Sequence, residues 1–109
     1  MGHIWSGQVD AILAAGRSLD GAGVRNWALA REDALLALKQ LQQIGVAVLG
    51  GDVYAVSGNA VVLSYDNWHC DQGAGESAAD FLNRSIDSAR NYISSYGSAD
   101  ALFAMVPLI

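Results

Sequence analysis

Hydrophobic residues recur at helical spacing in two stretches of the first half of the chain. Residues 8–19 carry an apolar stripe, with Ser6 placed to cap the start of a helix and Asp20-Gly21 placed to end it. In residues 32–44 leucine or isoleucine recurs at every third position, and two carboxylates lie in the first turn, where the helix dipole favours them. Gly45 follows where a left-handed C-cap belongs. The pattern predicts two helices before residue 46.

A third and longer amphipathic pattern begins after Ser77 and ends at Gly97. Ser77 and Asp80 have the spacing of a capping box, which predicts a helix start at this point. The opposite, polar face offers Asp80 and Arg84 as an i, i+4 ion pair. The apolar stripe that we expect to be buried consists of Phe81, Leu82, Ile86, Ala89, Ile93 and Tyr96. This is the clearest predicted element of the chain.

Strand-like patterns occupy much of the remaining sequence. Residues 46–56 are rich in β-branched side chains and are interrupted by a Gly-Gly-Asp run at 50–52, which indicates a bulge or bend. A Ser-Gly-Asn turn at 57–59 then predicts a hairpin with residues 60–65. Residues 101–106 form a last strand-like run, and Pro107 confines that end to a sheet edge or a terminus. Residues 24–29 fit either a short strand or the approach to the second helix.

These elements predict an α+β fold: a small antiparallel or mixed sheet, with a central hairpin and a C-terminal strand, packed against about three helices. The chain has 109 residues, of which 52% are hydrophobic and 16% charged. This length and composition are typical of one packed globular unit, so we expect a single domain over residues 1–109.

The balance of charge limits the classes of partner. The formal net charge is −5 and the isoelectric point is near 4.6. An acidic chain has no general attraction for nucleic acid or for an anionic membrane, whereas a basic protein would be steered toward it. The single cysteine permits no internal disulfide, no apolar run is long enough to span a bilayer, and the start lacks the pattern of a secretory signal. We therefore expect a soluble cytoplasmic protein.

The densest chemistry lies in residues 65–71, where His69 and the thiol of Cys70 suggest a nucleophile with its base. Adjacent residues of a strand project to opposite faces, which argues against this pair, and His3 lies near a terminus. The acidic residues around His69 match no established metal-binding spacing. We expect no catalytic residue, cofactor or metal site, and a small hydrolase or thiol enzyme using Cys70 with a histidine stays open as an alternative.

The aromatic and acidic residues of the same region suggest a surface that binds a protein partner. Aromatic side chains dominate binding hot spots, and carboxylates orient a basic partner. Trp68 fits a core position as well as an interface. The predicted partner-binding residues are Asp52, Tyr54, Tyr65, Asp66, Trp68, Asp71 and Glu76.

Several short motifs, in this order and spacing, resemble one known family. They are Trp27-Ala28-Leu29, Arg31-Glu32-Asp33-Ala34-Leu35, Leu49-Gly50-Gly51-Asp52-Val53-Tyr54, Tyr65-Asp66-Asn67-Trp68 with Cys70, Gly75-Glu76-Ser77, Asp80-Phe81 and Arg84-Ser85-Ile86. The chain is similar to the immunity protein 40 family of bacterial polymorphic toxin systems, small proteins encoded beside toxin genes. The resemblance implies a non-enzymatic protein that binds and neutralises a cognate toxin domain, and many such toxins are nucleases. A structural subunit of another complex is a further alternative.

Overall fold

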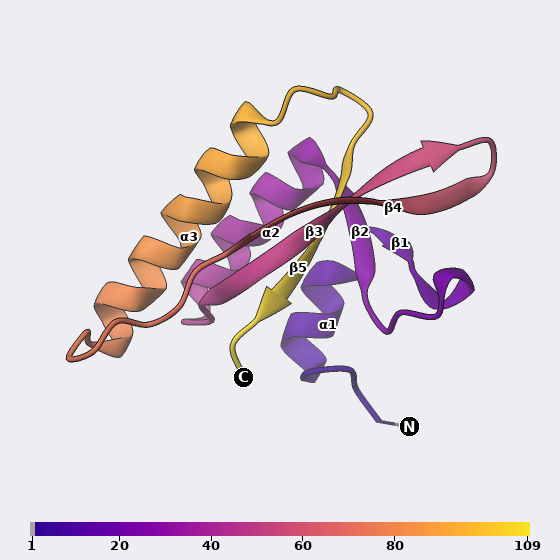
Figure 1. Cartoon of the computed structure of the whole chain (residues 1–109). Helices are drawn as coiled ribbons and strands as arrows, with labels where there is room; N and C mark the ends of the chain where they lie inside the picture. The colour runs from indigo at the N-terminus through magenta and orange to yellow at the C-terminus, as the bar shows by residue number, and fades with distance from the viewer. Residues whose placement is uncertain (1) are drawn as a thin grey trace.

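The computed structural model describes residues 2–109, which contain three α-helices, five strands and a short 3₁₀ helix (Figure 1). The helices are α1 (Gly7–Leu13), α2 (Arg31–Gln43) and α3 (Ala78–Ser95), and the 3₁₀ helix is η1 (Asp20–Ala22). The strands are β1 (Arg17–Ser18), β2 (Trp27–Ala30), β3 (Val48–Ser57), β4 (Ala60–His69) and β5 (Leu102–Pro107).

The strands form one sheet in the order β1-β2-β5-β3-β4, and every neighbouring pair is antiparallel. The predicted α+β class is confirmed, and the sheet is antiparallel rather than mixed. β5 inserts between β2 and β3, so the C-terminal strand is an interior strand. Pro107 pairs with Val48 at the very end of β5, where a missing N–H interrupts little of the ladder. The two edges of the sheet are the short β1 and the long β4.

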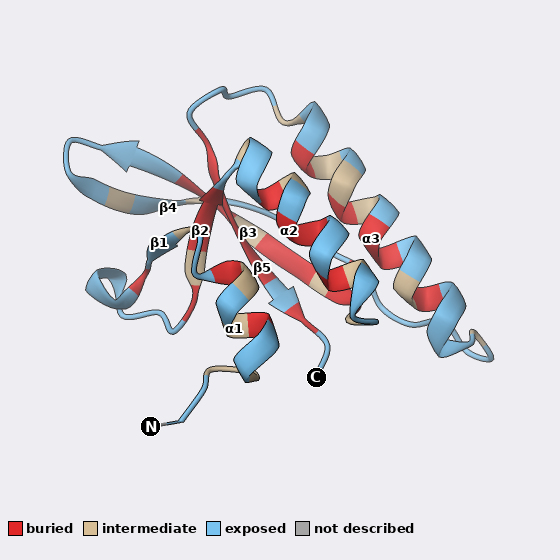
Figure 2. Ribbon diagram, turned by 180° about the vertical axis from the view of Figure 1, so that it is seen from behind, coloured by how far each residue is buried: buried red, intermediate tan, exposed pale blue. Residues whose placement is uncertain are grey.

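All three helices cover the same face of the sheet, and their buried sides meet the strands there (Figure 2). This follows from the apolar stripes of the helices, which must be removed from water against another apolar surface. From α3 the stripe contributes Ile86, Ala89 and Ile93, each fully buried. The strand residues in this main core are Leu29, Val48, Val53, Trp68, Phe103 and Met105.

The opposite face of the sheet carries only a small second cluster. Its members are the residue that precedes η1 and residues of β2, β3 and β5: Leu19, Ala28, Tyr54, Leu102 and Ala104. The β3–β4 hairpin continues past this cluster, and in Figure 1 its tip extends away from the three helices. The tip therefore has no helix layer over it.

The first predicted helix is too long. α1 begins after Ser6, whose hydroxyl accepts the backbone N–H of Val9 as expected of a cap, but it ends at Leu13 rather than at residue 19. The chain then packs tightly on β2, because a Cβ on Gly16 would lie 2.6 Å from the Ala28 carbonyl oxygen. Pairing of β1 with β2 outcompetes the helical periodicity, and the expected stop at Asp20-Gly21 instead begins η1.

The other predicted elements are confirmed with small changes of boundary. Gly45 adopts a left-handed φ of 77° after α2, and Ser77 caps α3 by accepting the Asp80 N–H. Residues 24–29, which fitted either a strand or the approach to the second helix, contribute their last three residues to β2. The hairpin turn lies where predicted, but β4 runs four residues beyond residue 65, to His69. No helix within residues 2–109 is long and apolar enough to cross a membrane.

Candidate functional site

The structure separates the seven predicted partner-binding residues into exposed and buried groups. Asp66 and Asp71 are exposed, Tyr65 is 82% exposed, and Asp52 is half-buried. Tyr54 and Trp68 are buried, and Glu76 is half-buried. Only part of the predicted set can therefore meet a partner directly.

Trp68 belongs to the main core. Its ring stacks on Tyr92 of α3, with ring centroids 4.8 Å apart, and only 8% of the residue is exposed. Gly51 on β3 makes room for this ring, because a Cβ there would lie 2.4 Å from Cη2 of Trp68. The indole Nε1 is buried and has no hydrogen-bond partner within residues 2–109. Trp68 contributes to packing, and it does not present a ring to a partner.

Tyr54 is buried on the other face of the sheet, in the small second cluster. Burial raises the pKa of its hydroxyl, and the nearby carboxylate of Asp52 raises this pKa further. The expectation that Tyr54 and Trp68 are surface anchors is thus corrected by their burial, since both rings face apolar neighbours on a half-covered sheet.

Tyr65 is the one predicted aromatic residue that faces solvent. It lies in an irregular part of β4, where residues 64–66 stand opposite Val53 alone. Its φ of 71° is the only positive value for a non-glycine residue within the described chain. A left-handed conformation costs a bulky residue about 1–2 kcal/mol. Strained residues of this kind cluster at functional sites, which makes Tyr65 a candidate interaction residue.

Asp66, the next residue, is held in place from α3. The Tyr96 hydroxyl donates a hydrogen bond of 2.5 Å to Oδ2 of Asp66, and this bond raises the pKa of the Tyr96 hydroxyl. Asp66 nonetheless remains exposed. The bulge of β4 thus carries an exposed aromatic ring and, at the next residue, an exposed and positioned carboxylate.

Glu76 has a structural role in the loop between β4 and α3. Both of its carboxylate oxygens accept hydrogen bonds from Arg84, at 2.8 and 2.7 Å, and one also accepts the Gly73 N–H. These bonds hold the pKa of Glu76 at about 2. The predicted pair of Arg84 with Asp80 is wrong, because the loop folds back and places Glu76 closer.

Arg84, for which the sequence predicted only a pair with Asp80, holds this loop together. Besides Glu76, it donates to the Asp71 carbonyl oxygen at 2.6 Å and to the Cys70 sulfur at 3.1 Å. A single guanidinium therefore fixes the end of β4 against α3. The side chain of Asp71 stays exposed beside it.

Cys70 and His69 lie in different surroundings. Cys70 is buried with Ala47 and Phe81, whereas His69 is exposed. The other histidine, His3, lies 3.7 Å from a carboxylate oxygen of Asp10 near α1. Within residues 2–109 no three His, Cys, Asp or Glu side chains are grouped closely enough to hold a metal ion.

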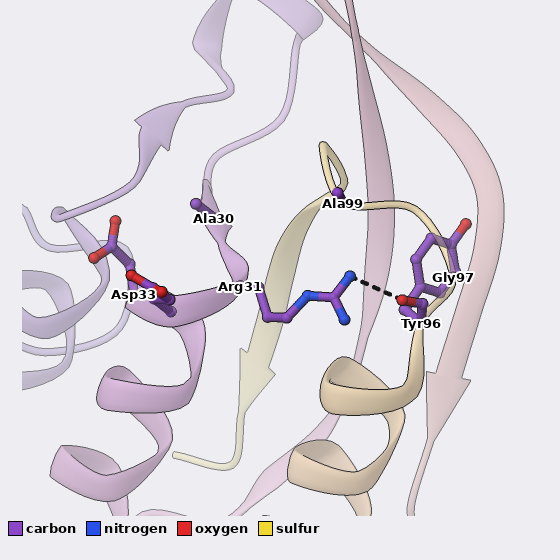
Figure 3. Close-up of a pocket in the computed structure, with 7 residues that line it drawn as sticks. Ala30, Arg31, Asp33, Tyr96, Gly97 and Ala99 are labelled. Carbon is purple, nitrogen blue, oxygen red and sulfur yellow. Dashed lines mark hydrogen bonds between the residues drawn. The ribbon is translucent and has the colours of Figure 1, made fainter.

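A hollow of about 540 Å³ lies between the start of α2 and the end of α3 (Figure 3). Arg31 spans it and donates to the carbonyl oxygens of Ser94, Tyr96 and Ser98 at 3.0, 2.8 and 2.8 Å. These bonds satisfy carbonyls left unpaired at the end of α3. Arg31 is therefore engaged in fastening two helices, and no thiol, imidazole or serine hydroxyl lines the hollow to act as a nucleophile or base.

Exposed apolar residues gather on the β3–β4 hairpin, which sequence reasoning missed. Val56, Val62 and Leu63 are each 40–46% exposed, and Tyr65 follows them along β4. Their β-branched or apolar character fits a buried strand equally well, so their exposure could not be inferred from residue type. We group them with the accessible carboxylates of the hairpin and of the loop that follows it, on both faces of the sheet, under the name β4 surface: Asp52, Val56, Val62, Leu63, Tyr65, Asp66 and Asp71.

Comparisons with known proteins add one finding. No curated protein and no solved structure matches the chain. A family model described as immunity protein 40 matches residues 18–107, from β1 to the end of β5. The resemblance seen in the sequence motifs is confirmed, and the chain belongs to the immunity protein 40 family.

Proposed function

We propose that this protein neutralises a cognate bacterial toxin domain by binding it through the β4 surface, without catalysing a reaction. Membership of an immunity protein family supports a toxin-neutralising role. The observation that carries the choice of surface is Tyr65, an aromatic side chain that is 82% exposed and held at a φ of 71°. A bulky residue is rarely found in this conformation, and strained residues cluster at binding and catalytic sites, which supports a functional role for the exposed ring.

The chemistry around Tyr65 is that of a binding surface. Aromatic anchors supply most of the affinity of a typical interface, and Val62 and Leu63 expose apolar area on the same hairpin, one on each face of the sheet. Asp66 and Asp71 supply negative charge, and the whole chain carries a net charge of −5. This combination suits a basic protein, such as a nuclease domain whose cleft binds phosphates.

Binding rather than catalysis is supported by the state of the reactive groups. Cys70 is buried and Arg84 donates to its sulfur, whereas His69 is exposed, an arrangement that does not favour a thiol with its base. Nor does the hollow beside Arg31 offer a nucleophile with a base. Within residues 2–109 these observations favour binding over the thiol-enzyme alternative.

Co-expression tests the proposal. The C-terminal domain of the protein encoded by the adjacent gene is expressed alone and together with this protein, and cell survival is measured. We expect the domain to be toxic alone and tolerated in the pair, with a stable complex on co-purification. A domain that is harmless alone, or a toxic domain that forms no complex, would contradict the proposal. A complex without toxicity would instead favour the structural-subunit alternative.

A further inference from the structure

The long strand β4 lies at an edge of the sheet, and its outer side pairs with no strand within residues 2–109. The other edge, β1, has only two residues. An unpaired strand of ten residues presents a row of backbone donors and acceptors that can template another strand. We propose that the toxin domain binds by adding an extended segment to the outer edge of β4. This inference rests on the proposed function and specifies how the same surface is used.

The register identifies which backbone groups are available. In antiparallel pairing, alternate residues direct their N–H and C=O toward the partner strand and away from it. The Cys70 N–H donates to the Leu49 carbonyl, so Cys70 faces β3. By alternation, and because residues 67–69 are paired in unbroken register, Asn67 and His69 direct their backbone groups outward.

The hairpin end gives the same alternation independently. Ser57 and Ala60 flank a two-residue turn with Gly58 at a φ of 60°, and the pair that closes such a turn is hydrogen-bonded. Val61 and Leu63 therefore direct their backbone groups outward. The available edge has two parts, residues 60–63 and residues 67–69, separated by the bulge that carries Tyr65.

The side chains beside this edge define the chemistry of the added segment. Val62 and Leu63 project to opposite faces of the sheet, so apolar side chains of a partner strand would find exposed apolar contacts on both faces. Asp66, positioned by Tyr96, lies at the bulge and would pair with a basic residue. The segment that fits carries apolar residues beside 60–63 and a lysine or arginine beside Asp66.

A second copy of this chain fits the edge less well. Each copy carries a net charge of −5, and a copy of β4 would bring its own Asp66 instead of a cation. The bulge at residues 64–66 also interrupts the ladder, a device by which natural edge strands resist pairing with copies of themselves. The charge of the chain favours a basic partner. The bulge at residues 64–66 favours a partner segment that can pair with β4 on both sides of it.

Amide hydrogen exchange tests the mode of binding directly. The probe is the C-terminal domain of the adjacent gene's product, and exchange is measured in the protein alone and in the complex. We expect the N–H groups of Leu63, Asn67 and His69 to exchange at least about 10-fold more slowly in the complex. The N–H groups of Arg17 and Ser18, at the other edge, serve as the control and should be unchanged.

A pair of variants at one position provides a second readout. Asn67→Pro removes an outward N–H while leaving the ladder with β3 intact, since proline is tolerated on edge strands. We expect it to weaken the complex at least about 10-fold, whereas Asn67→Ala should change Kd less than about 2-fold. If Asn67→Pro does not fold, as judged by circular dichroism, the exchange measurement decides.

The outcomes separate the two proposals. A stable complex in which the β4 amides exchange as fast as before overturns strand addition and leaves the neutralising role standing. Failure to form any complex overturns the proposed function, and strand addition falls with it. A dimer of the protein alone, with the β4 amides already protected, also overturns strand addition by a partner.

Discussion

Replacement of Trp68 by alanine should destabilise the fold strongly, because the structure places this residue in the core. Burial of an aromatic side chain removes about 150–250 Å² from water, which corresponds to about 4–6 kcal/mol at about 25 cal/mol per Å². The denatured chain already buries part of this area. We therefore expect Trp68→Ala to lower the free energy of unfolding by about 3–5 kcal/mol.

The matched variant is Trp68→Phe. It keeps a ring to stack on Tyr92, and it removes the buried Nε1–H that has no partner within residues 2–109. The lost ring area and the removed unpaired donor act in opposite directions, so the change should stay within about 1 kcal/mol.

Urea denaturation of the three proteins measures both differences. In thermal melts Trp68→Ala should lower Tm by about 12–20 °C, at about 4 °C per kcal/mol for a chain of this size. An alanine variant within 1 kcal/mol of the native protein would refute the core assignment. So would a phenylalanine variant that is as unstable as the alanine variant.

Three further outcomes are expected. The pKa of Glu76 is about 2, below the ordinary 4.5, so its bonds with Arg84 stabilise the fold above pH 4.5 and this contribution is lost as pH falls toward 2. In urea titrations Glu76→Gln should therefore cost stability at pH 6 and progressively less toward pH 2. A stability difference that does not change with pH would contradict this. Cys70 is 5% exposed, so a thiol reagent should label it much more slowly than it labels the denatured chain, and equal rates would contradict its burial. Gly51→Ala should lower the free energy of unfolding by about 1–3 kcal/mol in the same urea assay, because its Cβ would overlap the Trp68 ring and a backbone oxygen. An unchanged urea midpoint would refute that contact.

Elements with strong local signals were predictable from the sequence. Helix α3 is indicated by the cap at Ser77 and by an apolar stripe of several turns. The turn around Gly58 and the left-handed Gly45 are likewise encoded by residues within a few positions. In each case the physical cause is local, so a single sequence contains it.

Features set by contacts between distant segments were not predictable. The apolar periodicity of residues 8–19 suits a helix, but Gly16 approaches the Ala28 carbonyl and the chain turns there to pair with β2. Arg84 has a carboxylate at helical spacing, yet the loop brings Glu76 to it instead. Neither approach can be inferred from spacing along the chain.

The candidate surface was predicted only in part, for the same reason. The sequence placed aromatic and acidic residues in one region, and the structure keeps Tyr65 and Asp66 at its surface. Which rings are buried depends on the helix layer over Trp68 and the cluster around Tyr54. The strained φ of Tyr65 also depends on the register between β3 and β4.

The most direct test of toxin binding through the β4 surface is a calorimetric measurement of affinity for the adjacent gene's C-terminal domain. Tyr65→Ala is compared with Leu36→Ala, an apolar residue of α2 that is 55% exposed and lies outside the β4 surface. Alanine keeps a Cβ, so the backbone strain at position 65 is retained while the ring is lost. We expect Tyr65→Ala to raise Kd about 30-fold and Leu36→Ala to leave it unchanged. Equal affinities for Tyr65→Ala and the native protein would contradict the role of the β4 surface.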